Sequence, residues 1–232
     1  MTLLEVWWMI SLAAEGSVIA VAVKRMWHKV YPSFFLYLLF DLTASIGLFF
    51  IARLFPAPRW PGLYDYAWRA TNLVLVVGRI FLVFESYWRL ANVKIRWRFS
   101  DGMVYPIAAL AAITLHLELV RPFLWPDSRL ETVFGLIGAA HALLGFTLIG
   151  ILVASHRRSM RGTVPYRHAQ ILCAYLLATC GCYYTASQQP ASAGLPLMIV
   201  ATVCYVSWFV CLSRGRDRAR TYLEEEGHAA KA

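Results

Sequence analysis

Seven apolar blocks of about 20 residues each divide the 232-residue chain, and this pattern restricts the fold more than any other feature. A helix of about 20 residues rises about 30 Å, which matches the hydrocarbon core of a bilayer. The chain is 59% hydrophobic and only 15% charged, whereas about a quarter of the residues in a soluble domain are charged. The sequence therefore predicts an all-α, polytopic membrane protein with a seven-transmembrane-helix bundle. The predicted spans are residues 3–23, 32–54, 67–88, 103–120, 132–154, 168–187 and 195–213.

The connections between these blocks are short. The longest has about a dozen residues, which leaves no room for a soluble catalytic or DNA-binding domain. The blocks also show no sustained alternation of apolar and polar residues, which argues against the strands of a membrane barrel. We therefore predict one seven-helix transmembrane domain over residues 1–213 and a short charged cytoplasmic tail over residues 214–232.

The net charge of +9 is explained by membrane topology. Cytoplasmic loops of membrane proteins carry an excess of Lys and Arg. Sixteen basic residues fall on one side of the predicted spans and five on the other, which places the N-terminus outside and the C-terminus in the cytoplasm of a multi-pass inner (plasma) membrane protein. The lipid bilayer is the expected partner, and nucleic acid is not. The sixteen are Lys24, Arg25, Lys29, Arg89, Lys94, Arg96, Arg98, Arg157, Arg158, Arg161, Arg167, Arg214, Arg216, Arg218, Arg220 and Lys231.

No catalytic or cofactor motif is recognisable in the sequence. None of the four lysines lies in a predicted span, so a retinal Schiff base is not expected, and the six histidines include no pair one helical turn apart that suits a zinc site. The five cysteines lie within the last two predicted spans, and we interpret them as packing residues. We predict no catalytic residues, no cofactor and no metal.

Five of the ionisable side chains inside the predicted spans are candidates for a functional site. Such residues indicate functional sites, because placing a charge at the centre of a membrane helix costs roughly 2.5–3.5 kcal/mol. In antiparallel neighbours, two residues have the same depth when they are equally far from the connecting turn. This rule places Glu15, Asp41 and Arg79 at one level, with His141 within about one residue of them. The five are Glu15, Asp41, Arg79, Glu85 and His141.

The four level residues, Glu15, Asp41, Arg79 and His141, support two interpretations. In the first, they form a ligand- or proton-binding site, in which the second carboxylate is protonated, paired with protonated His141, or matched by a cationic ligand. In the second, they are a structural ion-pair cluster that holds the helices together. In both cases we expect Asp41 and Arg79 to form a direct or water-bridged pair facing the bundle interior, with Glu15 in the same layer.

Glu85 is a secondary candidate. Arg89 lies four residues further along the same predicted helix, and oppositely charged residues at this spacing are neighbours on a helix surface. The sequence therefore predicts an ion pair between Glu85 and Arg89 near the cytoplasmic interface.

One segment resembles a known group of proteins. The stretch Tyr31-Pro32-Ser33-Phe34-Phe35-Leu36-Tyr37, followed by Phe84-Glu85 at the end of the third span, is similar to a group of small, uncharacterised bacterial seven-helix membrane proteins. The resemblance covers the second and third helices. It implies a bacterial inner-membrane setting and no catalytic residue.

Three functions are compatible with these observations. The first is a non-enzymatic sensor, receptor or adaptor. It binds a ligand or a proton at the polar layer, which is the level of Glu15, Asp41, Arg79 and His141, and it signals through a membrane or cytoplasmic protein partner. The second is a small-solute transporter, although the predicted spans lack the helix-breaking residues that transporters use near their substrates. The third is an accessory subunit of a larger membrane complex, in which the polar layer is purely structural.

The predicted pairing gives a direct test by mutation. Arg79→Leu strands a buried carboxylate and should lower the free energy of unfolding by about 3–5 kcal/mol. Combining it with Asp41→Asn should recover part of this loss, because less charge is then left without a partner. Thermal unfolding in detergent measures both variants, and equal stability of the single and double variants would contradict the pairing.

Overall fold

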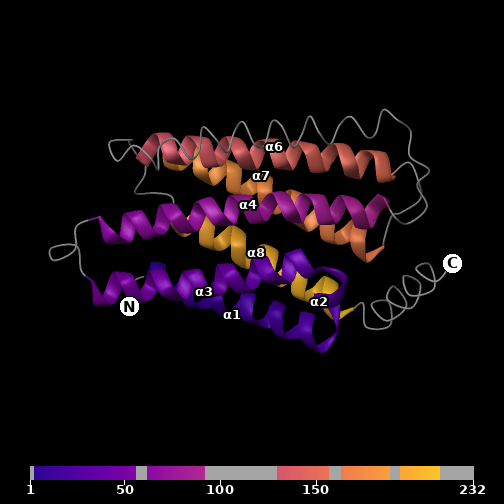
Figure 1. The fold of residues 1–232 in the computed structure, drawn as a ribbon, viewed down its shortest axis with the longest axis horizontal. Helices are drawn as coiled ribbons and strands as arrows, with labels where there is room; N and C mark the ends of the chain where they lie inside the picture. The colour runs from indigo at the N-terminus through magenta and orange to yellow at the C-terminus, as the bar shows by residue number, and fades with distance from the viewer. Residues whose placement is uncertain (1–2, 56–61, 92–129, 157–162, 189–193, 215–232) are drawn as a thin grey trace.

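The computed structural model describes residues 3–55, 62–91, 130–156, 163–188 and 194–214, and its regular structure in these segments is entirely helical. The prediction of an all-α chain is confirmed for this part of the molecule. The predicted span 103–120 and residues 215–232 of the predicted tail lie outside the described residues. The described helices (Figure 1) are α1 (Leu3–Lys24), α2 (Trp27–Val30), α3 (Pro32–Leu54), α4 (Leu63–Ala91), α6 (Leu130–His156), α7 (Val164–Gln188) and α8 (Gly194–Ser213).

Five of the described helices are long and apolar enough to cross a membrane, which fits a helical membrane protein. The predicted span 168–187 corresponds to α7, which has 25 residues and is long enough but more polar. Several of its polar side chains, among them His168 and Thr179, are buried against neighbouring helices. The five are Leu3–Lys24, Pro32–Leu54, Leu63–Leu90, Thr132–Ser155 and Gly194–Ser213.

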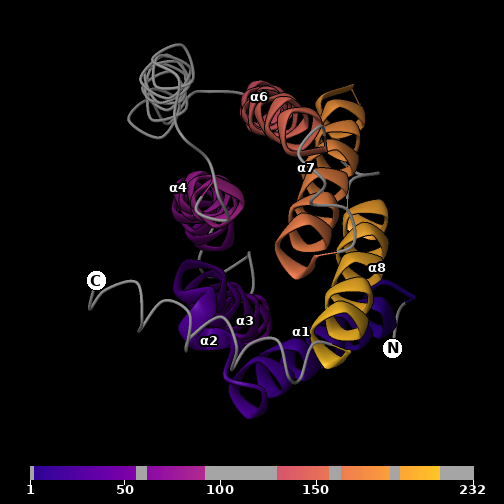
Figure 2. The ribbon, with the colours of Figure 1, turned by 90° about the vertical axis from the view of Figure 1, so that its right-hand side faces the viewer.

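The six long described helices form a ring. Viewed along the bundle (Figure 2), their order around the ring is α1, α3, α4, α6, α7 and α8, and each contacts the next. The ring closes through α8 and α1, and α4 also contacts α7 across it. The four level residues of the sequence analysis come from this ring, with Glu15 on α1, Asp41 on α3, Arg79 on α4 and His141 on α6.

The first connection folds back onto the last helix. Met26 has a left-handed backbone (φ 62°), which ends the turn after α1, and Tyr31 is non-helical before Pro32, which occupies the first turn of α3. The α conformation is disfavoured for a residue that precedes a proline, so Tyr31 interrupts the helix and α3 begins at Pro32. The indole nitrogen of Trp27 donates to the carbonyl oxygen of Leu212 on α8 at 3.1 Å, which anchors α2 to the end of α8.

A buried aromatic cluster lies at the same end of the bundle. His168 is fully buried, stacks on Tyr31 with ring centroids 4.6 Å apart, and meets the edge of Phe34 at 4.7 Å. Trp208 on α8 completes the cluster, with its ring 4.9 Å from that of Phe34. Aromatic pairs in this geometry add to the energy of burial, so the cluster holds α3, α7 and α8 together.

Helices α6 and α7 pack closely because α6 presents glycines to α7. A side-chain carbon added at Gly138 would lie 3.5 Å from the backbone oxygen of Cys180, and one added at Gly145 would lie only 2.6 Å from Leu177. In a bilayer, helix association depends on such close van der Waals contact, since lipid chains are as apolar as leucine. Gly150, on the same helix, has no heavy atom within 4 Å of that position.

This difference predicts the effect of a large side chain on α6. Gly145→Leu should destabilise the protein by about 1–3 kcal/mol, because α7 must move away. Gly150→Leu is the matched control and should leave stability nearly unchanged, since the site is open. Thermal unfolding followed by circular dichroism in detergent compares the two, and equal losses would contradict the described α6–α7 packing.

Candidate functional site

Arg79 lies at the centre of the polar layer. Its side chain is only 3% exposed, and it points from α4 into the ring between two tyrosines. Its Nε donates to the hydroxyl of Tyr37 on α3 at 3.0 Å, and its Nη2 donates to the hydroxyl of Tyr175 on α7 at 3.2 Å. The guanidinium carbon is also 5.7 Å from the centre of each ring, within range of a cation–π interaction.

The two carboxyl groups meet at a third tyrosine. The Tyr205 hydroxyl on α8 donates to Oδ2 of Asp41 on α3 at 2.7 Å, and it also lies beside the carboxyl group of Glu15 on α1. Glu15 is 2% exposed, and its Oε1 has no hydrogen-bond partner among the described residues. The carboxyl half of the layer therefore joins α1, α3 and α8.

Arg79 and the carboxylates do not touch directly. Among the described residues, Arg79 forms no ion pair with Asp41 or Glu15, so the predicted pair is not present in its direct form. The reason is register, because Tyr37 lies one helical turn before Asp41 on α3 and is the residue that Arg79 reaches. The charges of Arg79 and Asp41 still interact electrostatically. Both residues therefore belong to the layer, although Arg79 bonds to Tyr37 and not to Asp41.

His141 lies at the edge of this layer, on α6. It is fully buried, and its Nδ1 donates to the carbonyl oxygen of Ile137 at 2.6 Å. Within the described segments its Nε2 has no hydrogen-bond partner. Its ring is 5.3 Å from that of Tyr183, and it is close enough to Arg79 for the two to interact electrostatically. The four level candidates thus interact through tyrosine hydroxyls and by electrostatic interactions, without direct hydrogen bonds between them.

A second polar contact joins α4 to α7. The hydroxyl of Tyr183 donates to Oδ1 of Asn72 at 3.1 Å. Asn72 and Arg79 are about two turns apart on one face of α4, as are Tyr183 and Tyr175 on α7. The two helices therefore run antiparallel, with a tyrosine of α7 facing a polar residue of α4 at both levels.

Glu85 has a different role from the predicted one. Its two carboxylate oxygens accept the backbone N–H groups of Ser33 and Phe34, each at 3.0 Å. These amides belong to the first turn of α3, where backbone donors lack helical partners and the helix dipole favours a negative charge. Arg89 adds a favourable electrostatic contribution that ranks below these two bonds, so Glu85 is principally the cap of a neighbouring helix.

The residues that sequence reasoning missed are mainly tyrosines. Tyr37 appears in the sequence only as part of a motif, while Tyr175, Tyr183 and Tyr205 carry no charge and were not candidates. One signal was available, because tyrosines in membrane proteins prefer the interfaces. A tyrosine in the middle of an apolar span, away from an interface, indicates a buried hydrogen-bond partner.

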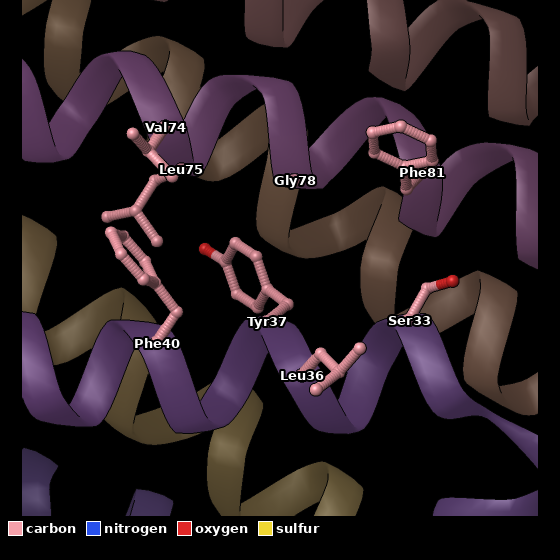
Figure 3. A pocket seen from close by; sticks show the side chains of 8 residues that line it. All are labelled: Ser33, Leu36, Tyr37, Phe40, Val74, Leu75, Gly78 and Phe81. Atoms are coloured by element: carbon pink, nitrogen blue, oxygen red, sulfur yellow. The ribbon is translucent and has the colours of Figure 1, made fainter.

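An apolar groove runs along the outside of α3 and α4 (Figure 3), with a volume of about 360 Å³. Tyr37 leans across it toward Gly78, where an added side-chain carbon would lie 3.0 Å from the tyrosine ring. Gly78 therefore leaves the space in which Tyr37 reaches Arg79. The lining residues are Ser33, Leu36, Tyr37, Phe40, Val74, Leu75, Gly78 and Phe81.

The described residues contain no group of three or more His, Cys, Asp or Glu side chains that could hold a metal ion. All five cysteines are free thiols. Comparison of the chain with models of protein families, with curated proteins and with solved structures gave no match.

The Arg79–Tyr37 bond predicts the cost of removing one hydroxyl. Tyr37→Phe leaves a buried guanidinium N–H without its acceptor and should reduce stability by about 1–3 kcal/mol. Tyr184→Phe on α7 is the control, because Tyr184 is 67% exposed and its hydroxyl should contribute little. Thermal unfolding of both variants in detergent gives the comparison, and a Tyr37→Phe protein as stable as the control would rule out this bond.

Proposed function

We propose that the protein is a non-enzymatic membrane sensor, receptor or adaptor whose signal acts on the polar layer. One observation supports this most strongly. Three polar atoms of the layer are buried without a hydrogen-bond partner in the part of the chain that the structure describes, namely Nη1 of Arg79, Oε1 of Glu15 and Nε2 of His141. Buried polar groups with a purely structural role are normally satisfied, so atoms left open indicate that the layer binds something.

The position of the layer suits signalling. Its hydrogen bonds connect α3 with α4, α4 with α7, and α3 with α8, while Glu15 brings in α1. A ligand that changes the charge or hydrogen bonding at this point acts on five helices together. A signal bound inside the membrane is thereby transmitted to the ends of the bundle.

The proposal includes a location and a topology. We infer seven membrane crossings, an N-terminus outside and a C-terminus in the cytoplasm of a bacterial inner membrane, in line with the distribution of basic residues and with the resemblance of the second and third helices. The partner is a membrane or cytoplasmic protein that reads the arrangement of the helix ends.

The test measures whether the layer sets that arrangement. Spin labels at positions 23 on α1 and 88 on α4, where the native Val23 and Trp88 are each 50% exposed, report a distance at one end of the bundle in a background without native cysteines. Asp41→Asn removes one charge from the layer. We expect it to produce a second, discrete distance population in lipid nanodiscs, because the carboxyl half of the layer holds α1, α3 and α8 together.

Thr43→Val is the matched control on α3, because Thr43 is exposed and bonds only within its own helix. It should leave the distance distribution unchanged. An Asp41→Asn protein with the wild-type distribution and reduced stability would contradict the proposal and favour the structural role of an accessory subunit. Asp41-dependent glucose flux through proteoliposomes would instead favour a transporter.

A further inference from the structure

The described part of the polar layer holds more negative than positive charge. Arg79 supplies one positive charge, whereas Asp41 and Glu15 supply two carboxyl groups. His141 donates from Nδ1 to the backbone oxygen of Ile137, and the charged group near it is Arg79. An unmatched charge in a medium of low polarity costs several kcal/mol. One further positive charge is therefore required in or beside the layer.

Glu15 has fewer favourable polar contacts than Asp41. Asp41 accepts a hydrogen bond from Tyr205 and interacts electrostatically with Arg79. Asp41 repels the charge of Glu15, and the hydroxyl of Tyr205 is the polar group that favours it. Oε1 of Glu15 is buried and accepts no hydrogen bond from the residues that the structure describes, and an ionised oxygen in that position has lost its water without replacement.

We propose that Glu15 binds one proton in the membrane interior and, with Asp41 and Tyr205, forms a proton-binding site. The inference rests on the proposed function, in which the layer binds the signal, and it names that signal as H⁺. The proton adds to a carboxylate oxygen of Glu15, one O–H bond forms from an oxygen lone pair, and no electron is transferred. The layer then changes from one net negative charge to none.

A proton fits this site better than a metal ion or an organic cation. A hard metal ion needs about six oxygen ligands, and the described residues contain no cluster of three ligating side chains. An organic cation needs a cavity, and the groove between α3 and α4, which is lined entirely by described residues, does not include Glu15. A proton needs only one open oxygen, which Glu15 has.

The other titratable groups near Glu15 are few. Helix α1 packs against α8, α3 and α2. Asp41 on α3 and Tyr205 on α8 face the carboxyl group, while α2 carries His28 and Lys29 at the end of α1, more than two helical turns away. Of the groups that face Glu15, Asp41 is the one that carries a charge, so loss of the proton from Glu15 places two negative charges between α1 and α3.

Infrared spectroscopy of the full chain in lipid nanodiscs detects such a proton directly, because a protonated carboxyl group has a C=O stretching band that a carboxylate lacks. At neutral pH we expect one band, shifted when glutamate labelled with a heavy carboxyl carbon is incorporated, and lost in Glu15→Gln. Glu85→Gln is the matched control and should retain the band, since both oxygens of Glu85 accept backbone N–H groups.

Three results would overturn the proposal: no band in the wild type, a band that the glutamate label does not shift, or a band that persists in Glu15→Gln. A band present in choline buffer and lost in sodium chloride would assign the site to a metal ion instead. The labelling result holds even if Glu15→Gln fails to fold. If Glu15 is protonated but Asp41→Asn leaves the spin-label distances unchanged, the proposed function is refuted and the proton-binding site is not.

Discussion

The structure depends on how one guanidinium group is accommodated inside the bundle. A charged arginine in the hydrocarbon region is costly, and Arg79 meets this cost with hydrogen bonds to Tyr37 and Tyr175 and with the faces of their rings. The two hydroxyls lie 3.4 Å apart, so each orients the other. Because the tyrosines come from α3 and α7, solvating the arginine also fixes α4 between these two helices.

The same pair of helices, α3 and α4, is held a second time at one end of the bundle. Glu85 caps the first turn of α3 through Ser33 and Phe34, and Tyr37 binds Arg79 one turn further along. Two contacts at different depths determine the register of an antiparallel pair, whereas a single contact leaves the helices free to pivot. The two parts of the motif singled out in the sequence, Tyr31–Tyr37 and Phe84-Glu85, are thus parts of one contact surface.

Much of the helical architecture was predictable from the sequence, since an apolar block of bilayer length has few alternatives to a helix. Depth was also predictable, because equal distance from a turn brings Glu15 level with Asp41. The partners within the layer were not, because an error of one turn in the depth rule brings Tyr37 to Arg79 in place of Asp41. The rotation of a helix about its axis is also left undetermined, so Glu85 turns toward the amides of α3, a partner that a search for opposite charges does not consider.

The layer divides into two halves that share α3. On one side, Tyr37 and Tyr175 hold Arg79, and on the other, Tyr205 holds Asp41 beside Glu15. Helix α1 packs mainly against α8, so these two helices form a unit whose polar contact with the rest of the layer runs through Asp41. In the site that we propose, a change of charge at Glu15 acts first on the bond from Tyr205 to Asp41, and we expect α1 and α8 to move against α3 in response.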